Sequence, residues 1–405
     1  MTLLTGYIMK TRETIIKRIF YSMDFVNGIR RAILGALGLL FFLSLGYNLL
    51  AVTSLFAIST LVMVLFEIPT GAFADHFSRK KSVVLSFFLF GIAFLGVFLF
   101  KNFWLLAIFW VLGDIAWTFQ SGTNIAWAVD NLKYGKNKKK LAALFVRFFF
   151  SEKLGLVIGG IIGFILVSMQ FRLVWLAIAV INFIMTLILL RYMKEEKTKH
   201  TRFKFKLIIK SFVKVKEAFT YLFNKKNKTA RGIALALFTG MLGLSSFFIE
   251  VPLILSKLGL KPEIISGVFS LMGVFILFAP FLGEKLAHKF GFRIFLGTTS
   301  IIVGLVIIIF GISPLLITAI ICLVLIYTGL NATDAIHESA FQHSIPSNCR
   351  ATIGSIMSVV WGISTALGVW LIGLIITFAG LGLAGLISGL LVIFTGFVYF
   401  YALKK

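Results

Sequence analysis

The chain is built from apolar stretches long enough to cross a membrane, separated by short polar turns. Ala51 to Phe73 and Val83 to Phe100 are two clear examples. A helix rises about 1.5 Å per residue, so about 20 apolar residues span the hydrocarbon core of a bilayer. Only 14% of the 405 residues are charged, against about 25% in a soluble domain. The sequence therefore predicts an all-α membrane protein with the lipid bilayer as its surroundings.

The net charge of +25 has two possible meanings. Nucleic-acid binding would require a basic soluble face, whereas here the basic residues lie in turns between apolar segments. These turns alternate between rich and poor in Lys and Arg, as the positive-inside rule describes. We therefore expect no nucleic-acid partner, a location in the cytoplasmic membrane, and both termini on the cytoplasmic side. We expect no metal or cofactor and no cleaved signal peptide, because neither their spacings nor a cleavage site is present.

Twelve spanning helices account for the apolar segments. They are expected near residues 20–43, 51–74, 82–100, 103–129, 141–167, 171–192, 230–256, 266–287, 293–312, 315–342, 351–378 and 381–402. The apolar core of the first, Ala32 to Leu43, is too short to cross a bilayer. We therefore extend this helix back to Phe20. Residues 1–19 are then a basic cytoplasmic tail.

The turn from Gly71 to Lys81 is the most specific motif. Its pattern resembles the G-x-x-x-D-x-x-G-R-K/R loop of the major facilitator superfamily, with Ser78 in place of the second glycine. Three further stretches are similar to that family: residues 66–71, 121–127 and 350–355. The resemblance covers essentially the whole chain and points to the bacterial 12-helix efflux-type branch. It implies a major facilitator fold of 12 transmembrane helices in two pseudo-symmetric six-helix halves.

An internal repeat agrees with that fold. An offset of 213 residues places Phe56 on Phe269, Ala74 on Ala287 and Phe77 on Phe290. Residues 194–229 hold twelve Lys or Arg against three Glu, with apolar residues at helical spacing. We expect this segment to be a cytoplasmic linker whose amphipathic helix lies on the membrane surface. The expected domains are thus a tail (1–19), an N-terminal bundle (20–193), the linker (194–229) and a C-terminal bundle (230–405).

The resemblance implies a cytoplasmic gate around the turn from Gly71 to Lys81. Asp75 is expected to lie on the N-terminal end of the helix that begins near Ala351, where the helix dipole favours a carboxylate. Arg79 can pair with Asp130, and a weaker equivalent would join Arg293 and Glu338. Gly71 and Lys80 complete the motif. The alternative is a turn that only sets topology, with solvated charges.

Acidic residues inside the predicted spans are candidates for carrying protons. Asp114 lies about eleven residues into its helix, ~16 Å deep. Burial disfavours the charged form of a carboxylate, and a proton carrier near neutral pH needs that property. Glu67, Glu250 and Asp334 are further candidates. The alternative is that each acid pairs permanently with an arginine, since an isolated charge in the bilayer is costly.

Polar and aromatic residues of the predicted spans are candidates for the substrate cavity. Asp24, Asn27 and Arg31 share one helical face, and Trp117, Ser121 and Asn124 recur at helical spacing with Asp114. The other candidates are Arg30, Arg147, Asn331 and Trp361. The glycine run from Gly155 to Gly163 resembles an antiporter motif, although close helix packing alone would also explain it.

These features favour a secondary active transporter that works by alternating access. The leading hypothesis is proton-coupled export of an amphipathic small molecule or drug by a monomer. The alternative is uptake of a small organic anion by proton symport, motivated by Arg30, Arg31 and Arg147. A membrane enzyme acting on lipids and a non-transporting sensor are remote alternatives, because no nucleophile elbow, metal cluster or phosphate loop is present.

Overall fold

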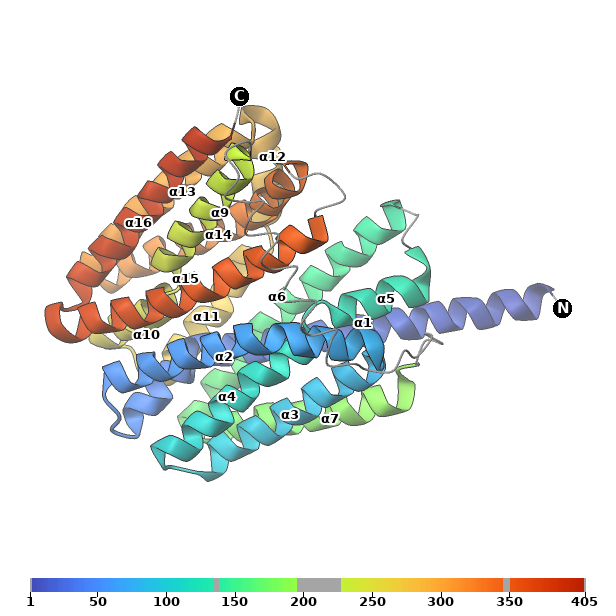
Figure 1. The fold of residues 1–405 in the computed structure, drawn as a ribbon. Coiled ribbons are helices and arrows are strands. Elements are labelled where there is room, and N and C mark those ends of the chain that lie inside the picture. Colours follow the sequence, from blue (N-terminus) through green and yellow to red (C-terminus); the bar gives the residue numbers. More distant parts are fainter. Residues whose placement is uncertain (1, 135–137, 195–226, 345–349, 404–405) are drawn as a thin grey trace. The chain divides into compact units, whose positions relative to one another are not determined.

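The computed structural model describes residues 2–134, 138–194, 227–344 and 350–403 (Figure 1). Every regular element within these ranges is helical. The predicted amphipathic helix of the linker falls on residues 195–226 and lies outside the described residues. The side chains of Asp75, Glu338 and residues 350–356 are also outside them.

The helices of the first half follow the predicted order. They are α1 (Thr2–Ser44), α2 (Leu49–His76), α3 (Arg79–Leu99), α4 (Phe103–Gln120), α5 (Thr123–Leu132), α6 (Lys138–Met169) and α7 (Leu173–Tyr192).

The second half has a similar series of helices. They are α9 (Lys228–Leu244), α10 (Phe247–Lys257), α11 (Pro262–Ile276), α12 (Ala279–Phe290), α13 (Phe292–Ile312), α14 (Leu316–Ser344), α15 (Arg350–Ala379) and α16 (Leu381–Ala402).

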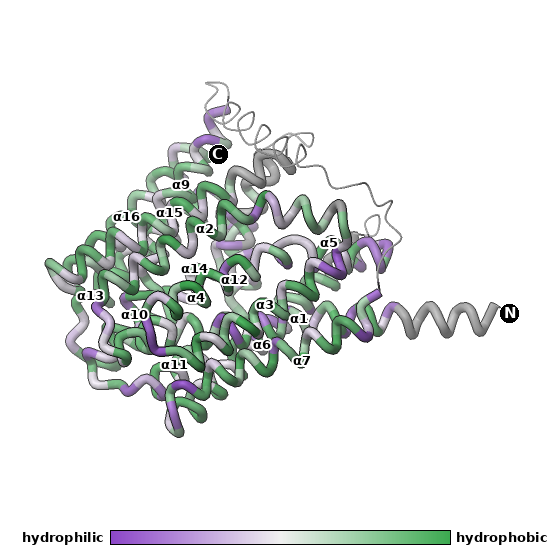
Figure 2. The backbone as a smooth tube through the Cα atoms, turned by 60° about the horizontal axis from the view of Figure 1, so that its bottom comes forward, coloured by the Kyte–Doolittle hydropathy of each residue, from purple (hydrophilic) through white to green (hydrophobic). Residues whose placement is uncertain are grey.

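Within the described residues, 11 helices are long and apolar enough to cross a membrane, and a bent pair, α11 with α12, brings the total to as many as 12. Figure 2 shows hydrophobic residues along these helices. The predicted all-helical membrane fold is confirmed.

The chain forms two compact units. Unit 1 comprises Met1–Leu34 and Leu65–Ile208, and unit 2 comprises Gly35–Val64 and Ile209–Lys405. The boundary between them passes through two continuous helices, α1 and α2.

Three predicted spans are interrupted. The fourth ends at Gln120 and resumes at Thr123, where Gly122 has a φ of 69°, a left-handed conformation that glycine adopts without strain. The seventh breaks at Ser245 and Ser246, between α9 and α10. The eighth bends by 41° between α11 and α12. Apolar sequence resumes within a few residues of each break, so apolar length alone did not reveal them.

The first helix begins earlier than the sequence predicted. It starts at Thr2, whereas the apolar pattern placed its start near Phe20. Glu13 and Lys17 form an i, i+4 ion pair of 2.6 Å on this extension, which stabilises a helix outside lipid as well as inside it. Glu13 also accepts a hydrogen bond from the Tyr134 hydroxyl. The predicted start near Phe20 followed from hydrophobic length. The contacts of Glu13 with Lys17 and Tyr134 extend the helix beyond that start.

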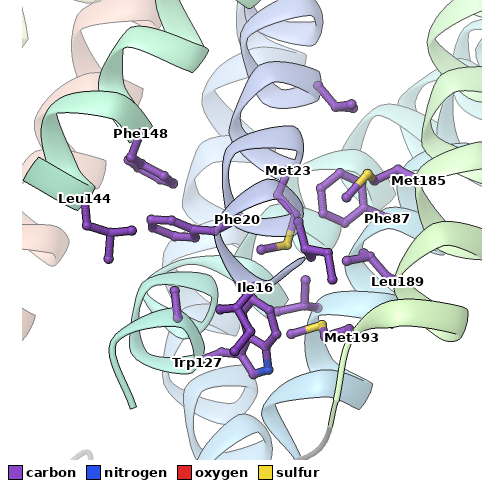
Figure 3. Packing of buried hydrophobic residues seen from close by; sticks show 14 of the residues in the cluster. Ile16, Phe20, Met23, Phe87, Trp127, Leu144, Phe148, Met185, Leu189 and Met193 are labelled. Carbon is purple, nitrogen blue, oxygen red and sulfur yellow. The ribbon is translucent and has the colours of Figure 1, made fainter. Parts of the chain in front are cut away.

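The core of unit 1 surrounds α1. Phe20 stacks on Phe148 of α6 with ring centroids 4.3 Å apart, and Trp127 of α5 is 1% exposed. Figure 3 shows these side chains together with Phe87 of α3 and Met185 of α7. Aromatic and other apolar residues therefore join α1 to four other helices of the unit.

In unit 2, α13 and α16 pack closely against each other. A Cβ atom on Gly304 would clash with the carbonyl of Gly389, and one on Gly389 would clash with the carbonyl of Gly304. The two backbones can approach this closely only because both positions lack side chains.

Candidate functional site

The turn between α2 and α3 is held by capping and by two basic side chains. Ser78 is the N-cap of α3, and its hydroxyl accepts a hydrogen bond from the Lys81 backbone N–H at 3.1 Å. This bond satisfies one of the free donors at the start of a helix. The serine that departs from the family motif therefore has a structural role of its own.

Arg79 and Lys80 connect this turn to other helices of unit 1. Arg79 forms the predicted ion pair with Asp130 of α5, and Lys80 donates to the carbonyl of Leu190 on α7 at 3.0 Å. The Asp130 side chain is 48% exposed, so water and salt weaken the pair. The contact exists as predicted, while its role in a gate stays a prediction. The Asp75 side chain, on which the gate most depends, lies outside the described residues.

The corresponding residues of unit 2 make different contacts. Arg293 donates from Nε to the carbonyl of Phe400 at 2.9 Å. The Glu338 side chain lies outside the described residues, so the predicted partner is not tested. Nearby in sequence, His337 Nδ1 lies 2.5 Å from the hydroxyl of Tyr399.

A second group of polar residues lies inside unit 1, on α1, α4 and α6. Asn27 is fully buried, and its amide exchanges two hydrogen bonds with the amide of Gln120, at 3.1 and 3.2 Å. Gln120 is the last residue of α4 before the break at Gly122. The amide pair therefore fixes α1 against the point where the fourth span is interrupted.

Arg31 of α1 forms an ion pair with Glu152 of α6. Glu152 is 5% exposed, and its other oxygen lies 3.9 Å from Lys153 Nζ. Glycines bring the two helices together: a Cβ on Gly28 would clash with the Glu152 carbonyl, and one on Gly155 with the Phe25 carbonyl. The packing interpretation of the glycine run is thus supported by direct backbone contact.

Arg30 points to different neighbours from those of Arg31. Its guanidinium carbon lies 3.5 Å from the ring centroid of Phe90 on α3 and 5.5 Å from that of Trp117 on α4. Asp24 and Asp114 are close enough for their charges to act on it. Asp24 is 5% exposed and Asp114 is partly exposed. Five predicted site residues, Asp24, Asn27, Arg30, Arg31 and Trp117, thus lie within one charged cluster with Asp114, which we call the unit 1 cluster.

The remaining candidates of unit 1 are more dispersed. Glu67 of α2 is partly exposed and shares a hydrogen bond with Ser121, at the break after α4. Asn124 is buried in the first turn of α5. Arg147 of α6 is exposed.

Unit 2 contains a buried acid in a neutral setting. Glu250 of α10 is fully buried, and its Oε1 accepts a hydrogen bond from the Ser388 hydroxyl of α16 at 2.7 Å. The Ser388 hydroxyl also lies 2.8 Å from that of Ser246. Within the described part of the chain, Oε2 of Glu250 has no hydrogen-bond partner and neither oxygen forms an ion pair.

The other candidates of unit 2 are not part of this group. Asp334 and Trp361 are exposed, the latter by 40%. Asn331 donates to the carbonyl of Tyr327 within its own helix at 2.9 Å.

Sequence reasoning missed three residues of these clusters: Gln120, Glu152 and Ser388. Glu152, like Asp114, is an acidic residue inside a predicted apolar span. This signal could have identified it from the sequence. Gln120 and Ser388 carry no such signal, because their importance comes only from the partner that folding places beside them.

Comparison with known proteins identifies the family. The profile described as Major Facilitator Superfamily matches residues 20–369. The chain belongs to this superfamily. A curated relative, the uncharacterized MFS-type transporter YxaM of Bacillus subtilis (strain 168), is 28% identical over 214 residues, and the match covers 51% of each chain. The chain thus spans about half of that relative's length.

Solved structures show the same fold. A point mutant of the nucleoside transporter NupG has a TM-score of 0.79 at 12% identity, covering 96% of this chain and 100% of its own. A bacterial homologue of the human lysosomal transporter Spinster, inward-facing and unoccupied, has a TM-score of 0.76 at 16% identity, covering 96% and 97%. The superfamily match places the chain among multi-pass membrane transporters, and the solved structures agree with its fold.

Proposed function

We propose that this protein is a secondary active transporter driven by protons through alternating access. The observation that supports proton coupling is the burial of Glu250 without an ion pair among the described residues. An ionised carboxylate without a positive partner is unstable in an apolar interior. The hydrogen-bond partners of Glu250 among the described residues are serine hydroxyls. Burial therefore favours its neutral form, and it can lose its proton when water reaches it. Asp114, Glu67 and Asp334 are secondary candidates, because each is at least partly exposed.

The test uses purified protein in liposomes that contain a pH-sensitive dye. Lipophilic cations, neutral drugs and organic anions are screened for substrate-dependent proton movement. Glu250→Gln should abolish that movement, whereas Glu284→Gln, at an acid whose side chain is 67% exposed, should not. Full proton movement in Glu250→Gln would refute this role, and Asp114→Asn would then be the next variant.

For the transported molecule, we propose export of an amphipathic small molecule. The stretches that resemble the efflux-type branch support the direction. The formal charges in and next to the unit 1 cluster also cancel. Asp24 and Asp114 lie near Arg30, and Glu152 lies between Arg31 and Lys153. A balanced site beside Phe90 and Trp117 suits a molecule with a large apolar body better than a small, strongly charged ion.

A second candidate is uptake of a small organic anion by proton symport. Its support is Arg30, whose Nη1 has no hydrogen-bond partner in the described part of the chain. The liposome assay separates the two directions. Exchange of a substrate against protons favours export, and movement of an anion together with protons favours uptake.

We further propose that the turn between α2 and α3 is a cytoplasmic gate, in a monomer whose termini both face the cytoplasm. The residues of this gate are Gly71, Asp75, Arg79, Lys80 and Asp130. Arg293 and Glu338 are a weaker equivalent in unit 2. Asp75→Asn should slow transport while leaving substrate affinity nearly intact. Transport at the full rate would contradict the gate.

A further inference from the structure

Arg30 is the most unusual polar side chain of unit 1. It is 3% exposed, and its Nη1 is buried without a hydrogen-bond partner among the described residues. A guanidinium carries five N–H donors in a planar fork, and leaving such a donor unpaired in an apolar interior is costly. Its face is covered by Phe90, 3.5 Å from the ring centroid. Burial and packing thus fix the group while part of its hydrogen-bonding capacity is unused.

The acids around Arg30 compensate its charge without completing its hydrogen bonds. Glu152 is paired with Arg31 and Lys153. Asp24 hydrogen-bonds to Asn27, and Asp24 and Asp114 act on Arg30 through their charges. Negative charges close to Arg30 allow its positive charge to remain buried. Its Nη1 still lacks an acceptor oxygen among the described residues.

We propose that Arg30 recognises a carboxylate of the transported molecule. This inference rests on the proposed function as a small-molecule transporter and names the class of substrate: an amphipathic carboxylic acid. Arginine binds carboxylates through two parallel N–H···O bonds, a geometry that a single ammonium does not reproduce. A substrate carboxylate would supply an acceptor oxygen for Nη1 of Arg30, which has none among the described residues.

Trp117 defines where the apolar body of the substrate lies. This partly exposed ring is shared by the two arginines, with the guanidinium carbons of Arg30 and Arg31 at 5.5 and 5.0 Å from its centroid. The Arg31 side chain is 47% exposed. Trp117 and Arg31 are thus more exposed than Arg30, and we place the apolar body of the substrate beside them. Export and uptake are equally compatible with this placement.

Arg147 provides a matched control. It lies on α6 of the same unit, but it is exposed. The sequence alone gave Arg30, Arg31 and Arg147 equal weight as anion-binding residues. The structure separates them: Arg31 has an acidic partner, Arg147 faces outward, and Arg30 is buried with an unused donor.

The test measures binding of three probes with one apolar body: phenylbutyrate, phenylbutyramide and phenylbutylamine. Each is titrated calorimetrically into the purified full-length protein. We expect the wild-type protein to bind the acid at least roughly tenfold more tightly than the amide. Arg30→Gln should remove this preference, Arg30→Lys should reduce it, and Arg147→Gln should leave it unchanged.

Several results would overturn the proposal: no preference for the acid in the wild-type protein, no binding of any probe, or an unchanged preference in Arg30→Gln. The comparison of acid with amide can be made on the wild-type protein alone. If Arg30→Gln does not fold, this comparison and the reduced preference expected in Arg30→Lys still test the proposal. Glu250→Gln separates this proposal from proton coupling. It should keep the preference for the acid while losing proton movement, so either proposal can fail alone.

Discussion

Glu152 in unit 1 and Glu250 in unit 2 are both acids inside membrane spans, with exposures of 5% and 0%. Their surroundings are opposite. Glu152 lies between Arg31 and Lys153, whereas the described contacts of Glu250 are serine hydroxyls. A buried ion pair keeps its charge and fixes helix positions, while a buried acid without a countercharge must bind a proton. We infer that unit 1 uses its charges to hold a binding site and unit 2 uses its acid to exchange a proton.

The largest expected difference between the two acids is in proton movement. Glu250→Gln should abolish substrate-driven proton movement in liposomes, since an amide cannot release a proton. Glu152→Gln should retain it at a reduced rate, because its role is to pair with Arg31. Equal loss of proton movement in Glu250→Gln and Glu152→Gln would contradict the different roles inferred for the two acids.

The stability of the Arg31–Glu152 pair should be asymmetric. Arg31→Gln should lower the free energy of unfolding by about 3 kcal/mol, because it leaves Glu152 buried with only Lys153 nearby. Glu152→Gln should cost about 1 kcal/mol, because the half-exposed Arg31 can turn to water. Thermal unfolding in detergent compares the two variants. A larger loss in Glu152→Gln would show that water does not reach Arg31.

Replacement by methionine should sharpen the comparison, because it removes the carboxylate and keeps the volume. Glu250→Met should raise stability by about 1 kcal/mol, since a well-packed apolar group avoids burying an unpaired polar atom. Glu152→Met should lower stability, because Arg31 and Lys153 lose their acid. The same unfolding assay measures both. A destabilised Glu250→Met would mean that its hydroxyl contacts outweigh the cost of burial.

Effects of similar size should arise at the equivalent helix starts, where Ser78 in unit 1 corresponds to Gly291 in unit 2. Ser78→Ala should cost about 1 kcal/mol and Ser78→Gly only a few tenths, because glycine is itself an acceptable N-cap. Gly291 has a φ of 81°, so Gly291→Ala should cost about 1–2 kcal/mol through backbone strain. Thermal unfolding in detergent measures all three variants. The prediction fails if Gly291→Ala leaves stability unchanged and Ser78→Gly lowers it. Neither backbone strain at Gly291 nor capping at Ser78 would then explain the result.

The sequence predicted the fold well because membrane spans depend on apolar length, which is local. Pairing between helices is not local. Arg79 and Asp130 were paired in advance only because a family resemblance supplied the partner. The breaks at Gly122 and at Ser245–Ser246 were missed because each polar interruption is short and apolar sequence resumes after it. Glu250 was identified as a buried acid, but its hydroxyl surroundings depend on Ser388, 138 residues further along the chain.

Because the backbones of α1 and α6 are in direct contact, Gly28 and Gly155 should tolerate almost no substitution. Every other amino acid adds at least one carbon there, and each added carbon would strike a carbonyl on the opposite helix. Gly382, in contrast, has only a side-chain atom of Ile312 near its Cβ position, at 3.8 Å. A saturation scan should therefore find almost no functional replacements at Gly28 and Gly155 and more at Gly382. Gly28 and Gly155 would then be positions at which the sequence of this transporter cannot change during evolution.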